Sequence, residues 1–101
     1  MMNKYDKLIF ACMSIDENVN KAMHYAGLIS QKILKKYKAI PLVPYLSCFG
    51  NNQDRKQYEE LWKSMIEKSD VVLYFNEVDK EMQKQIDYAK AIKKKIYNEV
   101  I

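Results

Sequence analysis

Four polar side chains near the end of the chain could do chemistry together: Asp79, Glu81, Gln85 and Asp87. Helical spacing places Glu81 and Gln85, four residues apart, on one face, where Glu81 could supply negative charge beside the amide of Gln85. Asp87 lies about 200° around the helix from Gln85, so it is expected to face solvent. Asp79 comes just before this helix, a position that suits a helix cap, a ligand contact, or both.

The scarce residue types exclude several familiar sites. The chain has 2 Gly, Gly27 and Gly50, which lie too far apart for a dinucleotide-binding turn or a phosphate-binding loop. Cys12, Cys48 and His24 cannot make a four-ligand structural zinc site, and we expect neither a metal nor a cofactor. A phosphorylated Cys12, as in sugar-phosphotransferase B subunits, is the weaker alternative because two acids and no Gly follow it. His24 is expected to be partly exposed.

The net charge of +4 comes from a lysine excess, since Arg55 is the sole arginine. Lysine is a solvated point charge that is poor at planar, bidentate recognition of bases and phosphates. The runs 35–36 and 93–95 fall where helices should end and where the helix dipole favours cations. We therefore expect no nucleic-acid partner. No apolar stretch approaches the ~20 residues of a membrane span. With no signal peptide before the first apolar run, we expect a cytoplasmic protein with free thiols.

The hydrophobic pattern switches between continuous apolar runs, which predict buried strands, and three- and four-residue spacing, which predicts helices. The predicted strands cover residues 8–13, 39–43, 71–75 and 96–100. The predicted helices run from a capping box at 14–17 to about residue 36, from 54 to about 69, and from 80 to about 93. Trp62 stands at the centre of the strongest apolar stripe, so it belongs to the core or to a subunit contact.

This order of elements predicts one α/β domain over residues 1–101. Strand runs that do not alternate indicate a parallel sheet with helices on both faces. Right-handed crossovers with one reversal give a flavodoxin-like, three-layer fold with strand order 2-1-3-4, and the strand that contains Pro41 lies at an edge. Ligands bind such sheets beyond the carboxyl ends of the strands, at the switch point. The candidate ligand-binding residues are therefore Met13, Ser14, Pro44, Tyr45, Asn76 and Asp79.

Several segments carry a family resemblance through their order and spacing: 8–14, 44–46, 61–70 and 86–90. In these segments the chain resembles the nucleoside 2-deoxyribosyltransferase-like superfamily, especially its short phage and bacterial members. The resemblance implies a nucleoside or nucleotide ligand and cleavage or exchange of its N-glycosidic bond through a covalent glycosyl intermediate. It also implies a homodimer or higher homo-oligomer, with Trp62 or Tyr58 buried in the subunit contact.

The resemblance assigns roles to three residues of the last helix region. Asp79 matches the acidic residue that orients the leaving base, and Gln85 matches the nucleophilic glutamate. An amide has nearly the shape of a carboxylate, but it is a poor nucleophile and has no charge to stabilise a sugar cation. Glu81 stands where the family has a ligand-facing glycine. These departures imply that the fold is kept while the reaction is lost or altered.

Three functions follow from these observations. The first is a phage or mobile-element protein that binds a nucleoside or nucleotide without efficient turnover. The second is an active nucleoside transferase or N-glycoside hydrolase in which Asp79 or Glu81 supplies the essential carboxylate. The third is sequestration of a nucleotide second messenger.

Overall fold

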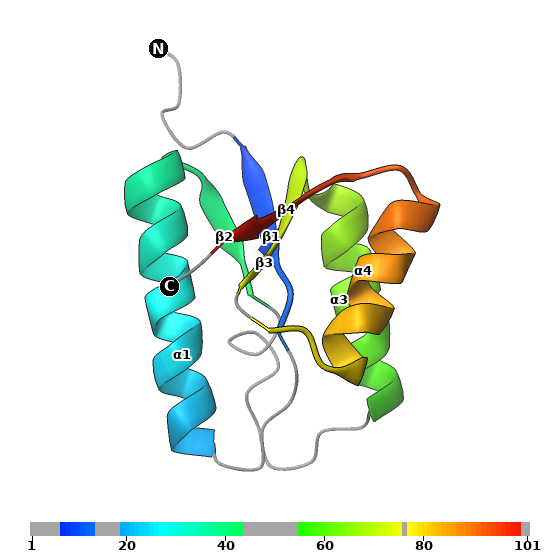
Figure 1. Cartoon of the computed structure of the whole chain (residues 1–101), viewed down its shortest axis with the longest axis horizontal. Coiled ribbons are helices and arrows are strands. Elements are labelled where there is room, and N and C mark those ends of the chain that lie inside the picture. The colour runs from blue at the N-terminus through cyan, green and yellow to red at the C-terminus, as the bar shows by residue number, and fades with distance from the viewer. Residues whose placement is uncertain (1–6, 14–18, 44–54, 76, 100–101) are drawn as a thin grey trace.

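The computed structural model describes residues 7–13, 19–43, 55–75 and 77–99, and it has the predicted parallel α/β fold (Figure 1). The sheet runs in the order β2-β1-β3-β4, and each neighbouring pair is parallel. Its strands are β1 (Leu8–Ala11), β2 (Ile40–Leu42), β3 (Val71–Phe75) and β4 (Lys95–Glu99). The predicted strand order 2-1-3-4 is confirmed.

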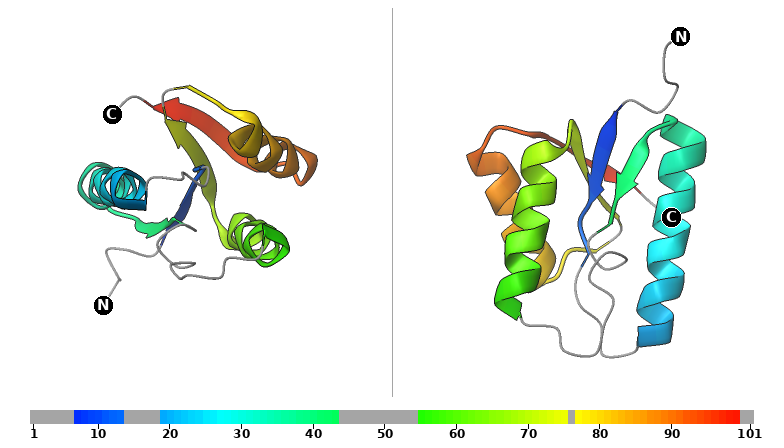
Figure 2. Two further views of the ribbon diagram at one scale, coloured as in Figure 1. Left: turned by 90° about the horizontal axis from the view of Figure 1, so that it is seen from below. Right: turned by 180° about the vertical axis from the view of Figure 1, so that it is seen from behind.

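The helices lie on both faces of this sheet, as the pattern predicts. They are α1 (Val19–Lys32), which continues into a π-helical turn, η1 (Ile33–Tyr37), then α3 (Arg55–Lys68) and α4 (Lys80–Ala91). Figure 2 shows α1 on one face and the pair α3 and α4 on the other. The chain changes face once because β3 returns past β1 to its other side, and right-handed crossovers then place the later helices opposite α1. No helix in the described ranges has the length and apolar character to cross a bilayer.

Two hydrophobic cores result, because successive strand side chains point to opposite faces. The core under α1 includes Ile9, Ala11, Leu73 and Phe75 of the strands with Ala26, Ile29 and Ile33 of the helix. The core under α3 and α4 includes Phe10, Cys12 and Val72 with Tyr58, Trp62, Ile66 and Ile86. The central strands contribute to both cores, which explains why their sequences are continuously apolar.

In the last lysine run, residues 93–95, one lysine has a structural contact. Lys93, the second residue after α4, is in the left-handed conformation, with φ 63°. The Nζ of Lys94 donates to the carbonyl oxygens of Glu67 (3.0 Å) and Ser69 (2.6 Å), at the carboxyl end of α3. Lys95 then begins β4. The run follows the end of α4, as predicted, but the Lys94 cation lies at the carboxyl end of a different helix, α3.

Candidate functional site

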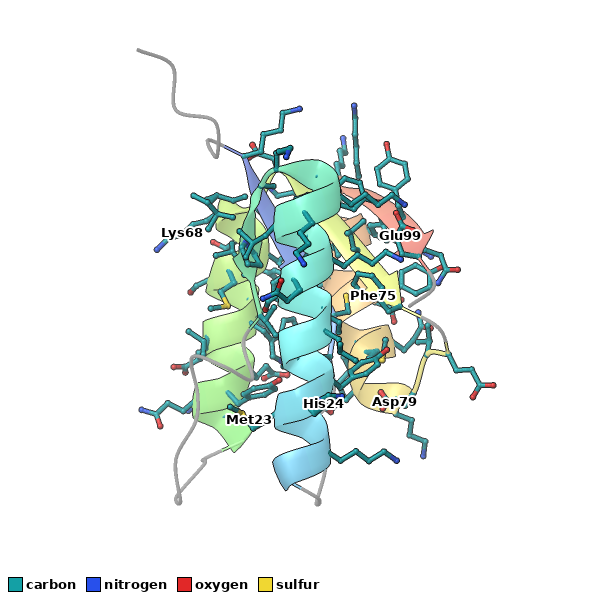
Figure 3. The ribbon with its side chains drawn as sticks, turned by 90° about the vertical axis from the view of Figure 1, so that its left-hand side faces the viewer. Met23, His24, Lys68, Phe75, Asp79 and Glu99 are labelled. Carbon is teal, nitrogen blue, oxygen red and sulfur yellow. The ribbon has the colours of Figure 1, made fainter. Side chains whose placement is uncertain are left out.

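The candidate site lies where the carboxyl ends of β1 and β3 meet the start of α4. This is the switch point of the sheet, because the chain leaves β1 toward β2 on one side and leaves β3 toward β4 on the other. Met13 follows β1, and Asp79 precedes α4. Figure 3 shows Asp79 at the same end of the molecule as His24 of α1, with Phe75 of β3 above them.

Gln85 is the central polar side chain of this region, and it is fully buried, with 0% of its surface exposed. Its Oε1 accepts a hydrogen bond from the backbone N–H of Met13 at 3.1 Å, and its Nε2 donates to the backbone oxygen of Met13 at 2.9 Å. The side-chain amide thus pairs with the backbone as a neighbouring strand would. One residue of α4 thereby fixes the end of β1.

Tyr58 of α3 completes this arrangement, and the sequence interpretation did not foresee it. Its hydroxyl donates to the same backbone oxygen of Met13 at 3.3 Å. The oxygen therefore receives two hydrogen bonds, which matches the two lone pairs of a carbonyl. The Met13 backbone is held from α3 and α4 at once, while Met13 itself belongs to the core under α1.

The amide at position 85 fits this environment better than a carboxylate would. A glutamate could accept from the Met13 N–H, but its ionised carboxylate has no hydrogen to donate to the Met13 oxygen. Two oxygens would then face each other in a buried site, and an unpaired buried charge is costly. The two hydrogen bonds between the Gln85 amide and the Met13 backbone are called the Gln85–Met13 tie below, and their role is structural. Gln85 has no exposed surface with which to touch a ligand.

Asp79 acts as the N-cap of α4, one of the two roles that its position suggested. Its Oδ1 accepts from the backbone N–H of Met82 at 2.9 Å, while the residue itself is exposed. The cap thus uses one of the two carboxylate oxygens, Oδ1. Glu81 lies in the first turn of α4 and is half-buried. Asp87 is exposed, as predicted, and accepts from the Nε2 of Gln83 at 2.8 Å.

Cys12 is unsuited to nucleophilic chemistry. Its thiol is free and buried, and burial raises its pKa from 9.0 to about 12. The reactive form of cysteine is the thiolate, which is scarce at neutral pH when the pKa is this high. The structure therefore argues against the phosphocysteine alternative.

The other residues singled out in the sequence lie in the core, on the surface or outside the described ranges. Tyr58 and Trp62 are buried within the chain, 0% and 1% exposed, so the expectation that either lies in a subunit contact is wrong. The core interpretation of Trp62 is confirmed, and its ring meets Tyr88 edge to face at a centroid distance of 5.9 Å. His24 is exposed, as expected. The further candidates Ser14, Pro44, Tyr45 and Asn76 lie outside the described residues.

A metal site and a match to a known protein would each help to identify the site. In the ranges that the structure describes, no three His, Cys, Asp or Glu residues are grouped to hold a metal ion. No model of a known protein family matches the chain, and no curated protein matches it. The fold and the site therefore define a parallel, doubly covered α/β domain with a polar switch point.

Proposed function

We propose that the chain is a nucleoside- or nucleotide-binding domain of the deoxyribosyltransferase-like fold that does not efficiently cleave the N-glycosidic bond. The observation that carries the proposal is the pairing of both amide groups of Gln85 with the backbone of Met13. In the family that the sequence resembles, the matching side chain must be free to attack the sugar. Here it is a buried neutral amide with its hydrogen bonds already made.

Two acids at the switch point support binding. Asp79 is exposed and Glu81 is half-buried, and both lie at the switch point where ligands of such sheets bind. Carboxylate oxygens accept hydrogen bonds from sugar hydroxyls and base amino groups. The same acids occupy the amino end of α4, where a phosphate would otherwise be attracted. We therefore expect a nucleoside to bind more tightly than its monophosphate.

The proposal extends to the setting of the protein. We expect it to act in the cytosol, in a phage or a mobile element, as a homo-oligomer. Cys12 as a free thiol fits a reducing compartment. These expectations rest on the family resemblance and on cysteine usage.

A thermal-shift screen with deoxynucleosides, their monophosphates and cyclic nucleotides tests the binding. A higher melting temperature with simple nucleosides is the expected result, because a ligand that binds the native state stabilises it. A shift with cyclic nucleotides alone would favour sequestration of a second messenger instead. No shift with any of them would remove the proposal.

Chromatography of the same incubations tests the absence of turnover. Intact nucleoside should be recovered after hours with equimolar protein. Free base in stoichiometric amount would show an active enzyme. The variants Glu81→Gln and Asp79→Asn would then decide between the two carboxylates, and base release that survives both would exclude each of them.

Two variants of Asp79 separate its cap from a ligand contact. Asp79→Asn keeps an N-cap acceptor, so stability should change little, whereas Asp79→Ala should cost about 1 kcal/mol. If Asp79 also binds the ligand through its charge, both variants should lower ligand affinity. Unchanged affinity in the asparagine variant would leave Asp79 as a cap alone.

A further inference from the structure

The two edges of the sheet differ in their ability to pair with another strand. β2 and β4 are the edge strands. β2 has three residues, and the N–H of Ile40 donates inward to Lys7 at 2.8 Å. Because backbone groups alternate in direction along a strand, the nitrogen of Pro41 faces outward, and it has no hydrogen to donate. The β2 edge is therefore blocked at its centre.

The β4 edge has no such block. It has five residues, Lys95–Glu99, without proline, and among the described elements β3 is its only sheet neighbour. Figure 2 shows β4 at the outer margin of the sheet. Its outer N–H and C=O groups form a row that another strand can join, and natural proteins usually protect such an edge. Among the residues that the structure describes, no second strand pairs with this edge.

Alternate side chains of β4 share the sheet face that α1 covers. Lys95, Tyr97 and Glu99 pair in register with Val71, Leu73 and Phe75, and the last two belong to the core under α1. Tyr97 is 52% exposed, the largest fraction among the exposed large hydrophobic side chains of the described residues. An aromatic side chain thus stands half-uncovered at the centre of an open edge.

The order of charges along β4 is self-complementary. We propose that β4 pairs antiparallel with β4 of a second copy of this chain, about a two-fold axis at Tyr97. In that register Lys95 of each copy lies opposite Glu99 of the other, and the two Tyr97 side chains meet at the axis. Opposite charges and aromatic pairs at facing positions stabilise antiparallel strands. Registers centred on Lys95 or Glu99 would instead place like charges opposite each other.

Glu99 is already ordered for this pairing. The Nζ of Lys36 lies 3.2 Å from its Oε1, so the carboxylate is held against η1 in the single chain. A carboxylate has about four acceptor positions, which leaves room for the lysine of a second copy. The second lysine would join an ion pair that is already formed.

The blocked β2 edge fixes the size of the assembly. Pairing β4 with β2 of the next copy would repeat without end, and Pro41 opposes it. Pairing β4 with β4 uses the same surface on both copies and closes as a dimer. The result is one continuous sheet across two chains, independent of whether the switch point binds a nucleoside.

Sedimentation equilibrium of the full chain tests the dimer directly. At roughly 100 µM, a concentration suited to an interface smaller than the standard size, we expect a mass near twice 12.0 kDa. A monomer at this concentration would overturn the proposal.

Two charge variants at the axis test the register. Tyr97→Lys and Tyr97→Glu each place like charges opposite each other, so each should weaken the dimer about tenfold or more. An equimolar mixture of the two should recover dimers, because opposite charges then meet at the axis. The axis at Tyr97 would be refuted if both single variants dimerised as tightly as wild type. It would also be refuted if the mixture dimerised no more tightly than each variant alone.

Cross-linking keeps the test decisive if a charge variant fails to fold. In a Cys48→Ser background, mild oxidation of Tyr97→Cys should give a covalent dimer, because the same position of both copies meets at the axis. Asn98→Cys is the matched control: it is the next residue, is also exposed, and lies opposite Ile96 of the second copy. Equal cross-linking at both positions would contradict the proposed register.

Discussion

The side-chain amide of Gln85 forms its hydrogen bonds within the fold. It is buried among the apolar residues of α4, and both of its hydrogen-bonding groups are paired with the backbone of Met13. A hydrogen bond that is made contributes modestly to stability, whereas a buried polar group left without a partner costs considerably more. The role of Gln85 is therefore to hold β1 and α4 together, and its pairing leaves no group to attack a sugar.

Replacing this amide with a carboxyl tests the tie. Gln85→Glu should lower the free energy of unfolding by about 2–4 kcal/mol at neutral pH, because a buried carboxylate then faces the Met13 oxygen. Burial raises the pKa of the introduced carboxyl above the unfolded value of about 4.3, and the protonated form can donate again. Between the two pKa values the native state holds a proton that the unfolded state releases. The loss in the free energy of unfolding should therefore shrink as pH falls toward about 4.3.

Urea denaturation at two pH values measures this effect. The matched control is Gln83→Glu, an exposed position in the same helix. It loses the hydrogen bond to Asp87 and places a like charge beside it, so stability should change by no more than about 1 kcal/mol at either pH. Equal stability of wild type and Gln85→Glu at neutral pH would mean that the tie contributes nothing.

The buried thiol of Cys12 gives an independent pH prediction. Its pKa is about 12 in the native state and 9.0 without burial, so between these values the native chain keeps a proton that the unfolded chain releases. The thiol's contribution to stability is complete below pH 9 and declines as pH rises through this window. Urea denaturation at pH 8 and pH 10.5 should show a steeper loss for wild type than for Cys12→Ala. Parallel losses would show that the thiol titrates normally in the folded protein.

At the scale of elements, the ends of the helices are set by lysines in unusual roles. Lys38 caps η1, and Lys93 is the second residue after α4; their φ values are 54° and 63°, both in the left-handed region. A side chain there costs about 1–2 kcal/mol relative to glycine, which is the usual residue at such an end. The chain, with 2 Gly in all, thus tolerates strain at two helix ends.

Relieving that strain should stabilise the protein. Lys93→Gly should raise the free energy of unfolding by about 1 kcal/mol, because glycine adopts a positive φ freely. Thermal denaturation checks it, with Lys93→Ala as the control that removes the charge but keeps the Cβ and should gain nothing. A glycine variant no more stable than the alanine variant would contradict the assigned strain.

The elements were predictable because their signals are local. Continuous apolar runs and helical spacing predicted four strands and three helices, and Pro41 identified an edge strand. The predicted bounds of the first strand extended past Ala11 because Cys12 and Met13 remain in the core after the strand ends.

The tie at the site was harder to predict because it joins residues 72 positions apart in the sequence. One signal was available: Gln85 lies within the stripe of Met82, Ile86 and Ala89, where a polar residue must find a buried partner. Nothing local indicated that the partner would be the backbone of Met13, or that the Tyr58 hydroxyl would join it.

At the scale of the molecule, the chain has a polar switch point at one end of the sheet and, among its described elements, one edge strand without proline. The acids of α4 remain at the carboxyl end of the sheet, while the position expected to attack a sugar is part of the core. The proposed ligand site uses the ends of the central strands, and the proposed dimer uses the side of β4. We therefore expect that mutation can abolish either one without the other.

One titration tests the central claim, that this switch point binds a nucleoside and leaves it intact. Deoxynucleosides are added to ¹⁵N-labelled protein, and the backbone amide signals and the ligand's sugar C1′ proton signal are followed in the same sample. We predict saturable shifts at Met13 and across residues 79–85, with the C1′ signal of the intact nucleoside unchanged for hours. Free-base signals would contradict the absence of turnover, and the absence of any saturable shift at these residues would contradict the binding site.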